Sequence, residues 1–279
     1  MSVPFKNVAI VCKHDDPRVV EPLQLLVDHL AKTSVNVLPA ADTGNADLII
    51  AIGGDGTMLY ASRVARESGT PILGINRGRL GFLADITPDE MFASVDSVLH
   101  GDYSTDSRQL LEVHLQRSDG QEQIAYALND VVLQGFGTGR MVDFETRVDG
   151  KYVNTHSGDG LIIATPTGST AYALSCGGPI IEPQLDAFVI VPVCPHTLTD
   201  RPIVISASQS IEVTLLDRDD TKAEITVDGF SMGEITATDK LQISAAKNRV
   251  TLLHPPAYDF YEILRSKLFW GRDSRKRDS

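Results

Sequence analysis

The feature that most limits how this chain can fold is an apolar run that ends abruptly in glycines. Residues 47–52 read Asp-Leu-Ile-Ile-Ala-Ile, and Gly53-Gly54-Asp55-Gly56-Thr57 follows at once. A run that is apolar at consecutive positions, and not only at alternate ones, is typical of a strand buried on both faces of a sheet. We therefore predict that this segment is a strand at the centre of a parallel sheet covered by helices.

The rest of the first hundred residues repeats the same alternation of short apolar runs and longer amphipathic segments. Strands are predicted at 8–12, 35–38, 47–52 and 71–76, and helices at 19–30, 57–67 and 88–99. Strands that alternate with helices in this way form parallel sheets with helices on their faces. We predict a Rossmann-like α/β domain over residues 1–100.

Beyond about residue 100 the pattern changes to short strands separated by turn residues. Strands are predicted at 110–116, 124–134, 143–148, 161–164, 188–193, 203–205, 211–216, 223–227, 241–245 and 249–253. Helical spacing returns only near the end of the chain, at 259–270. This texture predicts a β-rich domain over residues 101–253, with residues 254–279 packing back on the first domain.

Charge and cysteine content limit the classes of partner. The chain has 25 Lys and Arg against 37 Asp and Glu, a formal net charge of −12. Nucleic acid and anionic membranes are bound by basic surfaces, so we expect neither as a partner. Three cysteines without a C-x-x-C pair favour a reducing compartment. Because no apolar run approaches the roughly 20 residues of a membrane span, we expect a cytoplasmic protein.

The segment Gly53-Gly54-Asp55-Gly56-Thr57 joins the buried strand to a predicted helix. Glycines let the backbone turn sharply and approach a ligand, and the N–H groups of a helix N-terminus favour anions such as phosphate. Ligands of open α/β sheets also bind at the carboxyl ends of the strands. Neither G-x-x-x-x-G-K-[ST] nor G-x-G-x-x-G occurs in the chain, which excludes a Walker loop and the dinucleotide fingerprint.

Asp55 has two interpretations, because a carboxylate beside phosphates is unfavourable unless it accepts a proton or holds a metal ion. It caps the helix that begins near Thr57, or it is a general base that takes the proton of an attacking hydroxyl in phosphoryl transfer. In the second case, Mg²⁺ on the phosphates and the positioning of the reactants supply most of the remaining catalysis. The residues alone leave both interpretations open.

Two further segments place polar groups next to predicted strands. Gly158-Asp159-Gly160 and residues 165–172, Thr-Pro-Thr-Gly-Ser-Thr-Ala-Tyr, flank a short apolar run. They form either an ordinary turn with a capped helix or a polar cradle for a sugar or amide, with Tyr172 stacked on a base or ring of the ligand. Asn129-Asp130 interrupt an apolar segment. They either mark a strand edge that turns to solvent or bind a ribose diol or amino group.

Taken together and in order, these segments resemble the successive motifs of bacterial NAD kinases. The resemblance rests on residues 53–57, 128–130, 158–161, 165–172, Gly177-Gly178-Pro179-Ile180, residues 195–202 (Pro-His-Thr-Leu-Thr-Asp-Arg-Pro) and residues 264–270 (Leu-Arg-Ser-Lys-Leu-Phe-Trp). The Gly-Gly-Asp-Gly-Thr motif alone is shared with diacylglycerol, sphingosine and 6-phosphofructo kinases. The resemblance therefore implies a sheet domain of that kind, followed by the β-rich domain.

The resemblance implies transfer of the γ-phosphoryl group of ATP to the 2′-hydroxyl of the adenosine ribose of NAD, which gives NADP and ADP. Asp55 would be the base, with Gly56 beside it in the NAD site, and Asn129 and Asp130 would hold groups on the adenine side. The further implied dinucleotide contacts are Arg140, Ser157, Asp159, Thr170, Ala171, Tyr172 and Ser175. Some of these contacts cross a subunit boundary in relatives, which implies a homodimer or homotetramer. Mg²⁺ or another divalent cation would be carried mainly by the ATP phosphates, with no metal ligands supplied by the chain.

Two departures from the family pattern bear on the substrate. Many relatives have Glu where this chain has Asp130, which keeps the charge but reaches about one methylene less. Several relatives have an arginine at Ser157 that accompanies a preference for NAD over NADH, so the sequence leaves both acceptors open. Two other functions also remain: a lipid kinase with the same glycine motif, or a regulator that binds a dinucleotide without transferring phosphate.

Overall fold

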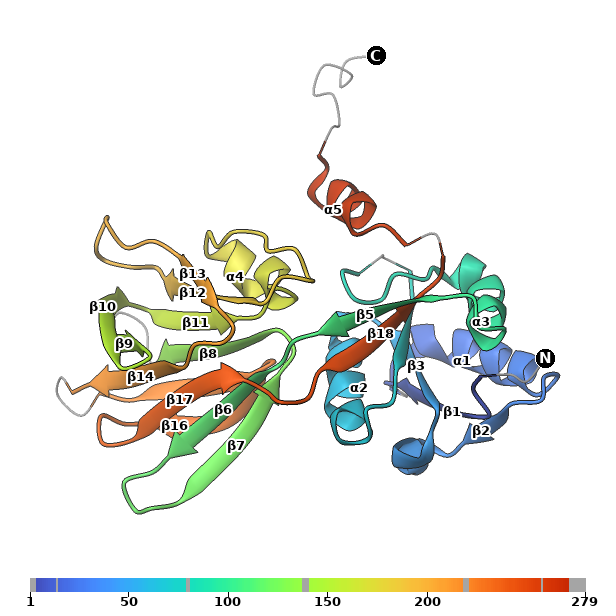
Figure 1. Ribbon diagram of the computed structural model, residues 1–279, viewed down its shortest axis with the longest axis horizontal. Helices are drawn as coiled ribbons and strands as arrows, with labels where there is room; N and C mark the ends of the chain where they lie inside the picture. The colour runs from blue at the N-terminus through green and yellow to red at the C-terminus, as the bar shows by residue number, and fades with distance from the viewer. Residues whose placement is uncertain are drawn as a thin grey trace, which may run out of the picture. The chain divides into compact units, whose positions relative to one another are not determined.

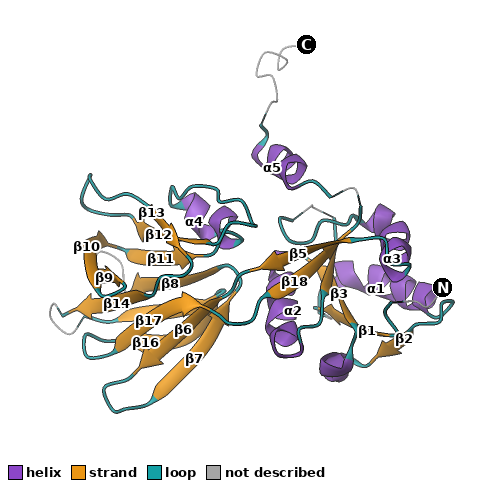
Figure 2. Ribbon diagram, in the orientation of Figure 1, coloured by secondary structure: helices purple, strands orange, loops and turns teal. Residues whose placement is uncertain are grey.

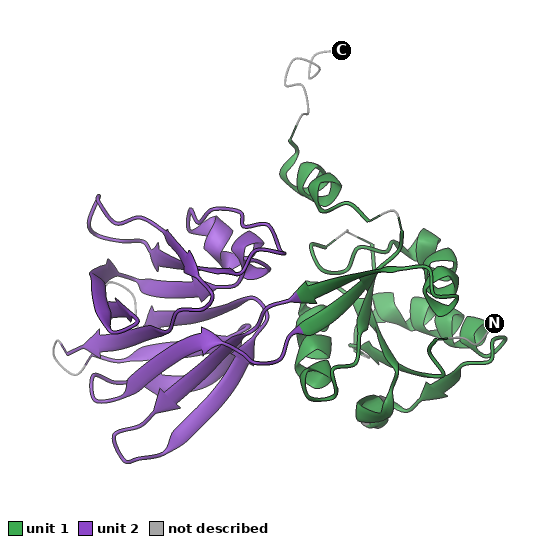
Figure 3. Cartoon of the chain, in the orientation of Figure 1, with its two compact units in different colours: residues 1–107, 250–279 green, residues 108–249 purple. Residues whose placement is uncertain are grey.

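The computed structural model describes residues 4–13, 15–78, 81–136, 141–217, 221–256 and 258–270, with only the backbone described at 40 and 41 (Figure 1). The chain divides into two compact units, residues 1–107 with 250–279 and residues 108–249 (Figure 3). Figure 2 shows helices packed around a sheet in the first unit and mostly strands in the second. No helix within the described ranges is both long and apolar enough to span a membrane.

The first unit is built on a six-stranded sheet in the order β2-β1-β3-β4-β18-β5. In that order the strands are Asn36–Leu38, Asn7–Cys12, Leu48–Gly53, Ile72–Asn76, Val250–His254 and Ser104–Arg108. Pairing is parallel from β2 through β18. Every residue of β3 is buried, so the prediction that the apolar run before the glycines is an interior strand of a parallel sheet is confirmed.

Helices cover both faces of this sheet. The helices of the unit are α1 (Pro17–Leu30), α2 (Asp55–Ser68), α3 (Met91–Leu99) and α5 (Phe260–Leu268), with short 3-10 helices η1 (Ala40–Asn45) and η2 (Pro88–Glu90). Leu48, Ile50 and Ile52 share a core with α1 and α3. The intervening residues of β3 point to the opposite face, and α2 packs against β3 and β4. This arrangement confirms the predicted α/β class.

The second unit consists of two antiparallel sheets that share one core. The first has the order β10-β9-β14-β17-β6-β7: Lys151–Gly158, Val142–Val148, Ile211–Leu216, Lys240–Ala245, Leu111–Gln116 and Glu122–Ala127. The second has the order β13-β12-β11-β8-β15-β16: Ile203–Ser206, Ala187–Val193, Gly160–Ala164, Asp130–Gly135, Ala223–Val227 and Phe230–Ile235. Buried side chains from both sheets, among them Phe144 and Phe188, form a single cluster. The predicted β-rich class is confirmed.

The outer face of the second sheet is covered by the segment that contains η3 (Gly168–Thr170) and α4 (Tyr172–Ser175). Ala173 and Ile181 pack there against Ile162, Val189 and Val191. These contacts fix the polar residues of this segment at the end of β11, where the candidate site lies.

The strands differ from the sequence prediction in three ways. The segment predicted as one strand at 124–134 is two strands, β7 and β8, because the backbone bends at Leu128-Asn129. The strand predicted at 249–253 has the apolar character of its neighbours in the β-rich sequence, but β18 pairs with β4 in the parallel sheet. Strands β5, β10 and β16 were not predicted, and each lies at the edge of its sheet.

Candidate functional site

The glycine motif forms a tight turn between β3 and α2. Gly54 is the N-cap of α2 and Asp55 is its first residue. A Cβ added to Gly53 would lie 2.0 Å from Thr57 Oγ1, so the turn closes only with glycine at this position. The N–H groups of Asp55 and Gly56 precede the first hydrogen bond of α2, in which Thr57 donates to the carbonyl of Gly54 at 2.9 Å. N–H groups at the start of a helix give that end a partial positive charge.

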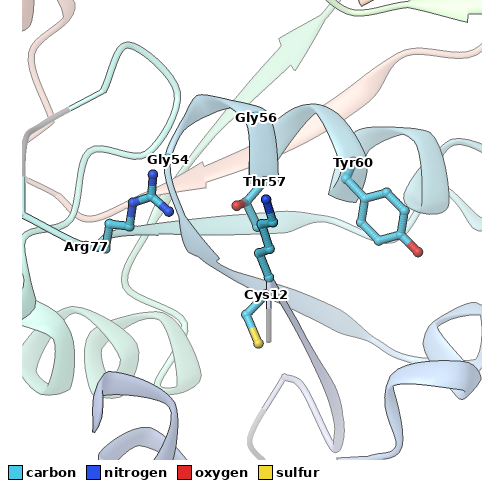
Figure 4. A pocket seen from close by; sticks show the side chains of 7 residues that line it. Cys12, Gly54, Gly56, Thr57, Tyr60 and Arg77 are labelled. Atoms are coloured by element: carbon cyan, nitrogen blue, oxygen red, sulfur yellow. The ribbon is translucent and has the colours of Figure 1, made fainter. Parts of the chain in front are cut away.

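A cavity of about 470 Å³ lies beside this turn (Figure 4). It is lined by Cys12, Lys13, Gly54, Gly56, Thr57, Tyr60 and Arg77. Cys12, Gly54 and Arg77 stand at or just beyond the carboxyl ends of β1, β3 and β4, the edge at which parallel sheets bind ligands. Two cationic side chains and a helix N-terminus make the cavity suited to phosphate groups.

Arg77 is held at this cavity by a carboxylate. Its guanidinium pairs with Asp16, the N-cap of α1, and Arg18 binds the same carboxylate at 2.9 Å. The hydrogen bond from Arg18 lowers the pKa of Asp16 to about 2. Asp16 is therefore ionised at neutral pH and orients Arg77.

The carboxylate of Asp55 is fixed by the loop that follows β4. Oδ2 accepts the N–H of Phe82 at 3.2 Å, and Oδ1 accepts the N–H of Leu83 at 3.1 Å. A Cβ on Gly81 would lie 2.1 Å from Oδ1, so the loop approaches this closely only with glycine there. Gly54 is the N-cap and makes no side-chain capping bond. These contacts differ from the capping role considered for Asp55, and each oxygen keeps a lone pair for a proton.

In the second unit, Asn129 and Asp130 lie at the bend between β7 and β8. Thr165 holds one side of the bend: its Oγ1 donates to the carbonyl of Leu128 at 2.5 Å, and its N–H donates to that of Asn129 at 2.9 Å. A Cβ on Gly168 would lie 2.0 Å from the Asn129 carbonyl oxygen. The segments around Asn129 and Thr165, read separately in the sequence, therefore form one structure.

Asp228 holds the other side of the bend, and sequence reasoning missed this residue. Its carboxylate accepts the N–H of Leu128 at 2.8 Å, of Asn129 at 2.7 Å and of Asp130 at 3.1 Å. Asp130 is buried. Burial, together with the nearby charge of Asp228, raises the pKa of Asp130 to about 7.

Asp159 and Tyr172 lie near each other in the second unit. Asp159 is exposed between β10 and β11, and its N–H donates to Val193 at 3.0 Å. Its charge is one of the causes that raise the pKa of Tyr172, of which burial is the largest. Cys194 donates a hydrogen bond to Asp159, which raises the pKa of the Cys194 thiol. Tyr172 is 39% exposed, so part of the residue is open to contact with a ligand.

The other predicted residues take up varied positions. Thr170 Oγ1 donates to the carbonyl of Thr167 at 3.2 Å, Ala171 precedes α4, and Ser175 is exposed at its end. Ser157 Oγ donates to Asp143 on the neighbouring strand at 2.5 Å. Arg140 lies outside the described residues. The structure thus brings Asp55 and Gly56 together in the first unit. In the second unit, Asn129 and Asp130 lie at the Ala164 end of β11, and Asp159 lies at its Gly160 end, near Tyr172.

Sequence reasoning also missed Lys13, Arg77 and the 81–83 loop. Lys13 and Arg77 each follow an apolar strand that was predicted, so the parallel order of the sheet could have identified them as neighbours of Asp55. In the described part of the chain, no three His, Cys, Asp or Glu side chains gather as a metal site.

Known proteins resemble this chain over nearly its whole length. Residues 12–103 match the family model of the ATP-NAD kinase N-terminal domain, and residues 128–254 match that of the ATP-NAD kinase C-terminal domain. An NAD kinase of Nitrosococcus oceani is 39% identical over 290 residues, covering 98% of this chain and 99% of that one. An NAD kinase of Thiobacillus denitrificans is 40% identical over 290 residues, with the same coverage of 98% and 99%.

Solved structures share the fold. Yeast NADH kinase complexed with NADH matches with a TM-score of 0.90 at 24% identity, over 97% of this chain and 89% of that one. An NAD kinase from Archaeoglobus fulgidus in complex with ATP matches with a TM-score of 0.73 at 27% identity, over 94% and 97%. With both family models matched in order and relatives near 40% identical from end to end, this chain belongs to the ATP-NAD kinase family.

Proposed function

We propose that the chain transfers the γ-phosphoryl group of ATP to the 2′-hydroxyl of the adenosine ribose of NAD, giving NADP and ADP. Membership of the ATP-NAD kinase family supports this reaction, and so do the relatives named NAD kinase that match over 98% of the chain. The observation that carries the proposal in this chain is the fixed orientation of the Asp55 carboxylate, which accepts two main-chain N–H groups and lies next to a cationic cavity and a helix N-terminus.

The phosphates of ATP occupy the cavity beside the glycine turn in this proposal. Lys13 and Arg77 supply positive charge, and the N–H groups at the start of α2 donate to phosphate oxygens. The turn keeps its backbone accessible, because a Cβ at Gly54 or Gly56 would meet no other atom within 4 Å. Phosphoryl transfer depends mainly on such positioning and charge stabilisation.

Asp55 is the general base. The 2′-oxygen forms a bond to the γ-phosphorus while the bond from that phosphorus to the β,γ-bridging oxygen breaks, and ADP leaves. The proton of the hydroxyl passes to the Asp55 carboxylate and from there to water. The N–H groups of Phe82 and Leu83 hold the carboxylate in one orientation throughout, which is the condition for efficient proton transfer.

The second unit binds NAD in this proposal. Asn129 and Asp130 bind groups on the adenine side, Tyr172 stacks on a ring, and Asp159 accepts hydrogen bonds from hydroxyl or amide groups. The remaining contacts are assigned by family resemblance to Gly56, Arg140, Ser157, Thr170, Ala171 and Ser175. Both NAD and NADH are tested as acceptors, because residue 157 is serine and not the arginine that accompanies a preference for NAD in several relatives.

Mg²⁺ arrives with ATP as part of the donor. On the phosphates it neutralises charge that develops in the transition state. The chain's own contribution at this point would be the positive charge of Lys13 and Arg77, which line the cavity proposed for the phosphates.

We further propose that the enzyme works in the cytoplasm as a homodimer or homotetramer, without nucleic acid or a membrane as partner. Three cysteines that form no disulfide and a net charge of −12 support the compartment and the choice of partners. Light scattering coupled to size-exclusion chromatography measures the subunit number directly, and a monomer would contradict the assembly.

The test of the reaction is an assay of the purified chain with ATP, Mg²⁺ and either NAD or NADH, with NADP and NADPH quantified. We expect NADP from NAD. The same assay with diacylglycerol in place of NAD measures the lipid kinase alternative. Product from neither dinucleotide would overturn the proposal.

A further inference from the structure

We propose that Asp228 is a positioning residue that sets the Asn129–Asp130 segment for dinucleotide binding, an inference that rests on the proposed function. Asp228 stands 98 residues from Asp130 in the sequence, in the Asp228–Gly229 turn between β15 and β16. Both turn residues have positive φ, 50° and 77°. This turn is of the kind that joins adjacent strands tightly, and it brings the Asp228 carboxylate over the end of β8.

Three successive main-chain N–H groups converge on this one carboxylate. Leu128 donates to Oδ2, and Asn129 and Asp130 both donate to Oδ1. The N–H of Asp228 in turn donates to the carbonyl of Asp130 at 2.9 Å. Hydrogen bonds to a charged acceptor are stronger than those between neutral groups. The bend between β7 and β8 therefore depends on Asp228.

Hydrogen bonds with Asp228 and with Thr165 fix the main chain of the bend, and a fixed main chain orients the side chains on it. The Asp228 carboxylate accepts hydrogen bonds from the three main-chain N–H groups. Thr165 donates hydrogen bonds to the carbonyls of Leu128 and Asn129. Among the described residues, the side-chain amide of Asn129 makes no hydrogen bond with the protein, and this residue is partly exposed. Its donors and acceptor are therefore available to a ligand, on a main chain that does not have to be ordered when the ligand binds.

The pKa values of the Asp228 and Asp130 carboxyl groups are both raised. Burial raises the pKa of Asp228, and the three N–H bonds that its carboxylate accepts offset part of that rise. Asp130 receives no comparable set, and its pKa is raised by burial and by Asp228. Asp130 is therefore partly protonated near neutral pH, and its protonated form can donate a hydrogen bond.

The chain contains a second Asp-Gly turn that serves as a matched control. Asp149 and Gly150 also have positive φ, 49° and 72°. Asp149 accepts the N–H of Ser210 at 3.0 Å and donates its own N–H to the carbonyl of Ser210 at 2.9 Å. The turn chemistry is the same, but this turn supports no residue of the candidate site. A general effect of removing such a carboxylate would appear in both variants.

The experiment compares wild type, Asp228→Asn, Asp228→Ala and Asp149→Asn in the NAD kinase assay, with NAD binding measured by calorimetry. Asp228→Asn keeps one acceptor oxygen and turns an NH₂ group toward N–H donors. We expect the KM and the Kd for NAD to rise by about tenfold or more. The KM for ATP and the kcat at saturating NAD stay within about twofold of wild type. Asp228→Ala has the larger effect, and Asp149→Asn has none.

The outcomes separate this inference from the function on which it rests. Wild-type protein that neither made NADP nor bound NAD would count against the proposed function. An active wild type with unaltered NAD affinity in Asp228→Asn would overturn the inference alone. Loss of the fold in Asp228→Asn, or equal losses in kcat and in both Michaelis constants, would also overturn it by showing a general structural role.

Discussion

Replacing Gly81 by Ala tests whether the position of the Asp55 carboxylate against the 81–83 loop controls catalysis. The added Cβ would lie 2.1 Å from Asp55 Oδ1, where ordinary contacts begin at 3.4 Å, so the carboxylate must move by about 1.3 Å. The backbone at Gly81 is not in the left-handed region, so alanine does not strain the loop itself. A misplacement of about 1 Å at a reacting group costs on the order of a hundredfold in rate, or about 2.7 kcal/mol in the barrier.

The assay is steady-state NADP formation at saturating ATP and NAD. We expect kcat to fall about a hundredfold, with the KM for ATP and the unfolding temperature close to wild type. Gly44→Ala is the matched control, because a Cβ there meets no atom within 4 Å and Gly44 lies in η1, outside the site. A Gly81→Ala variant that kept more than half of the wild-type kcat would refute the claim that the 81–83 loop positions the base.

Three further perturbations have defined outcomes. Because the pKa of Asp130 is raised to about 7 in the folded chain, protonation of this side chain stabilises the fold. This contribution to the free energy of unfolding is complete below about pH 4 and is lost as the pH rises through 7. Between pH 5 and 8 the free energy of unfolding of wild type should therefore fall by about 3 kcal/mol relative to that of Asp130→Asn. If denaturation curves gave the same difference in unfolding free energy between the two proteins at both pH values, this prediction would be contradicted. Lys13→Gln should raise the KM for ATP about tenfold by removing one charge from the phosphate cavity, while the KM for NAD stays unchanged; an equal rise in both would contradict the assignment of the cavity. Chelation of divalent cations by EDTA should abolish turnover, and added Mg²⁺ should restore it, while calorimetry shows NAD binding throughout; full activity in EDTA would show that the donor needs no cation.

The hydrophobic pattern predicted the interior strands and missed strands at the edges. Every residue of β3 is buried, so its apolar run leaves no other interpretation. Strands β5 and β10 have mostly polar sequences, Ser-Thr-Asp-Ser-Arg and Lys-Tyr-Val-Asn-Thr-His-Ser-Gly, and both lie at sheet edges. These edge strands carry only a weak alternation of apolar residues, so local sequence did not reveal them. The edge strands β2 and β13 contain adjacent apolar residues and were predicted.

The local sequence pattern also does not show to which sheet a strand belongs. β18 resembles the strands before it in length and composition, yet it pairs in parallel with β4, which lies about 180 residues earlier in the chain. Its apolar sequence suits either sheet. Only the completed parallel sheet, which continues past β4, determines where it pairs.

The same limit applies to the candidate site. The residues on the motifs themselves were visible in the sequence: glycines surround Asp55 and Asp159, and Asn129 interrupts an apolar segment. The groups that orient these residues come from elsewhere in the chain: the amides of Phe82 and Leu83 for Asp55, and Asp228 for Asn129. Such long-range partners follow from topology and not from spacing in the sequence.

The most direct test of the central claim is the Asp55→Asn variant, which preserves size and shape but removes the base. NADP formation and the binding of NAD and ATP by calorimetry are measured on the same preparation. The account predicts a fall in kcat of about 10²–10⁴-fold with both affinities within about threefold of wild type. An Asp55→Asn variant that formed NADP at close to the wild-type rate would contradict the assignment of Asp55 as the base.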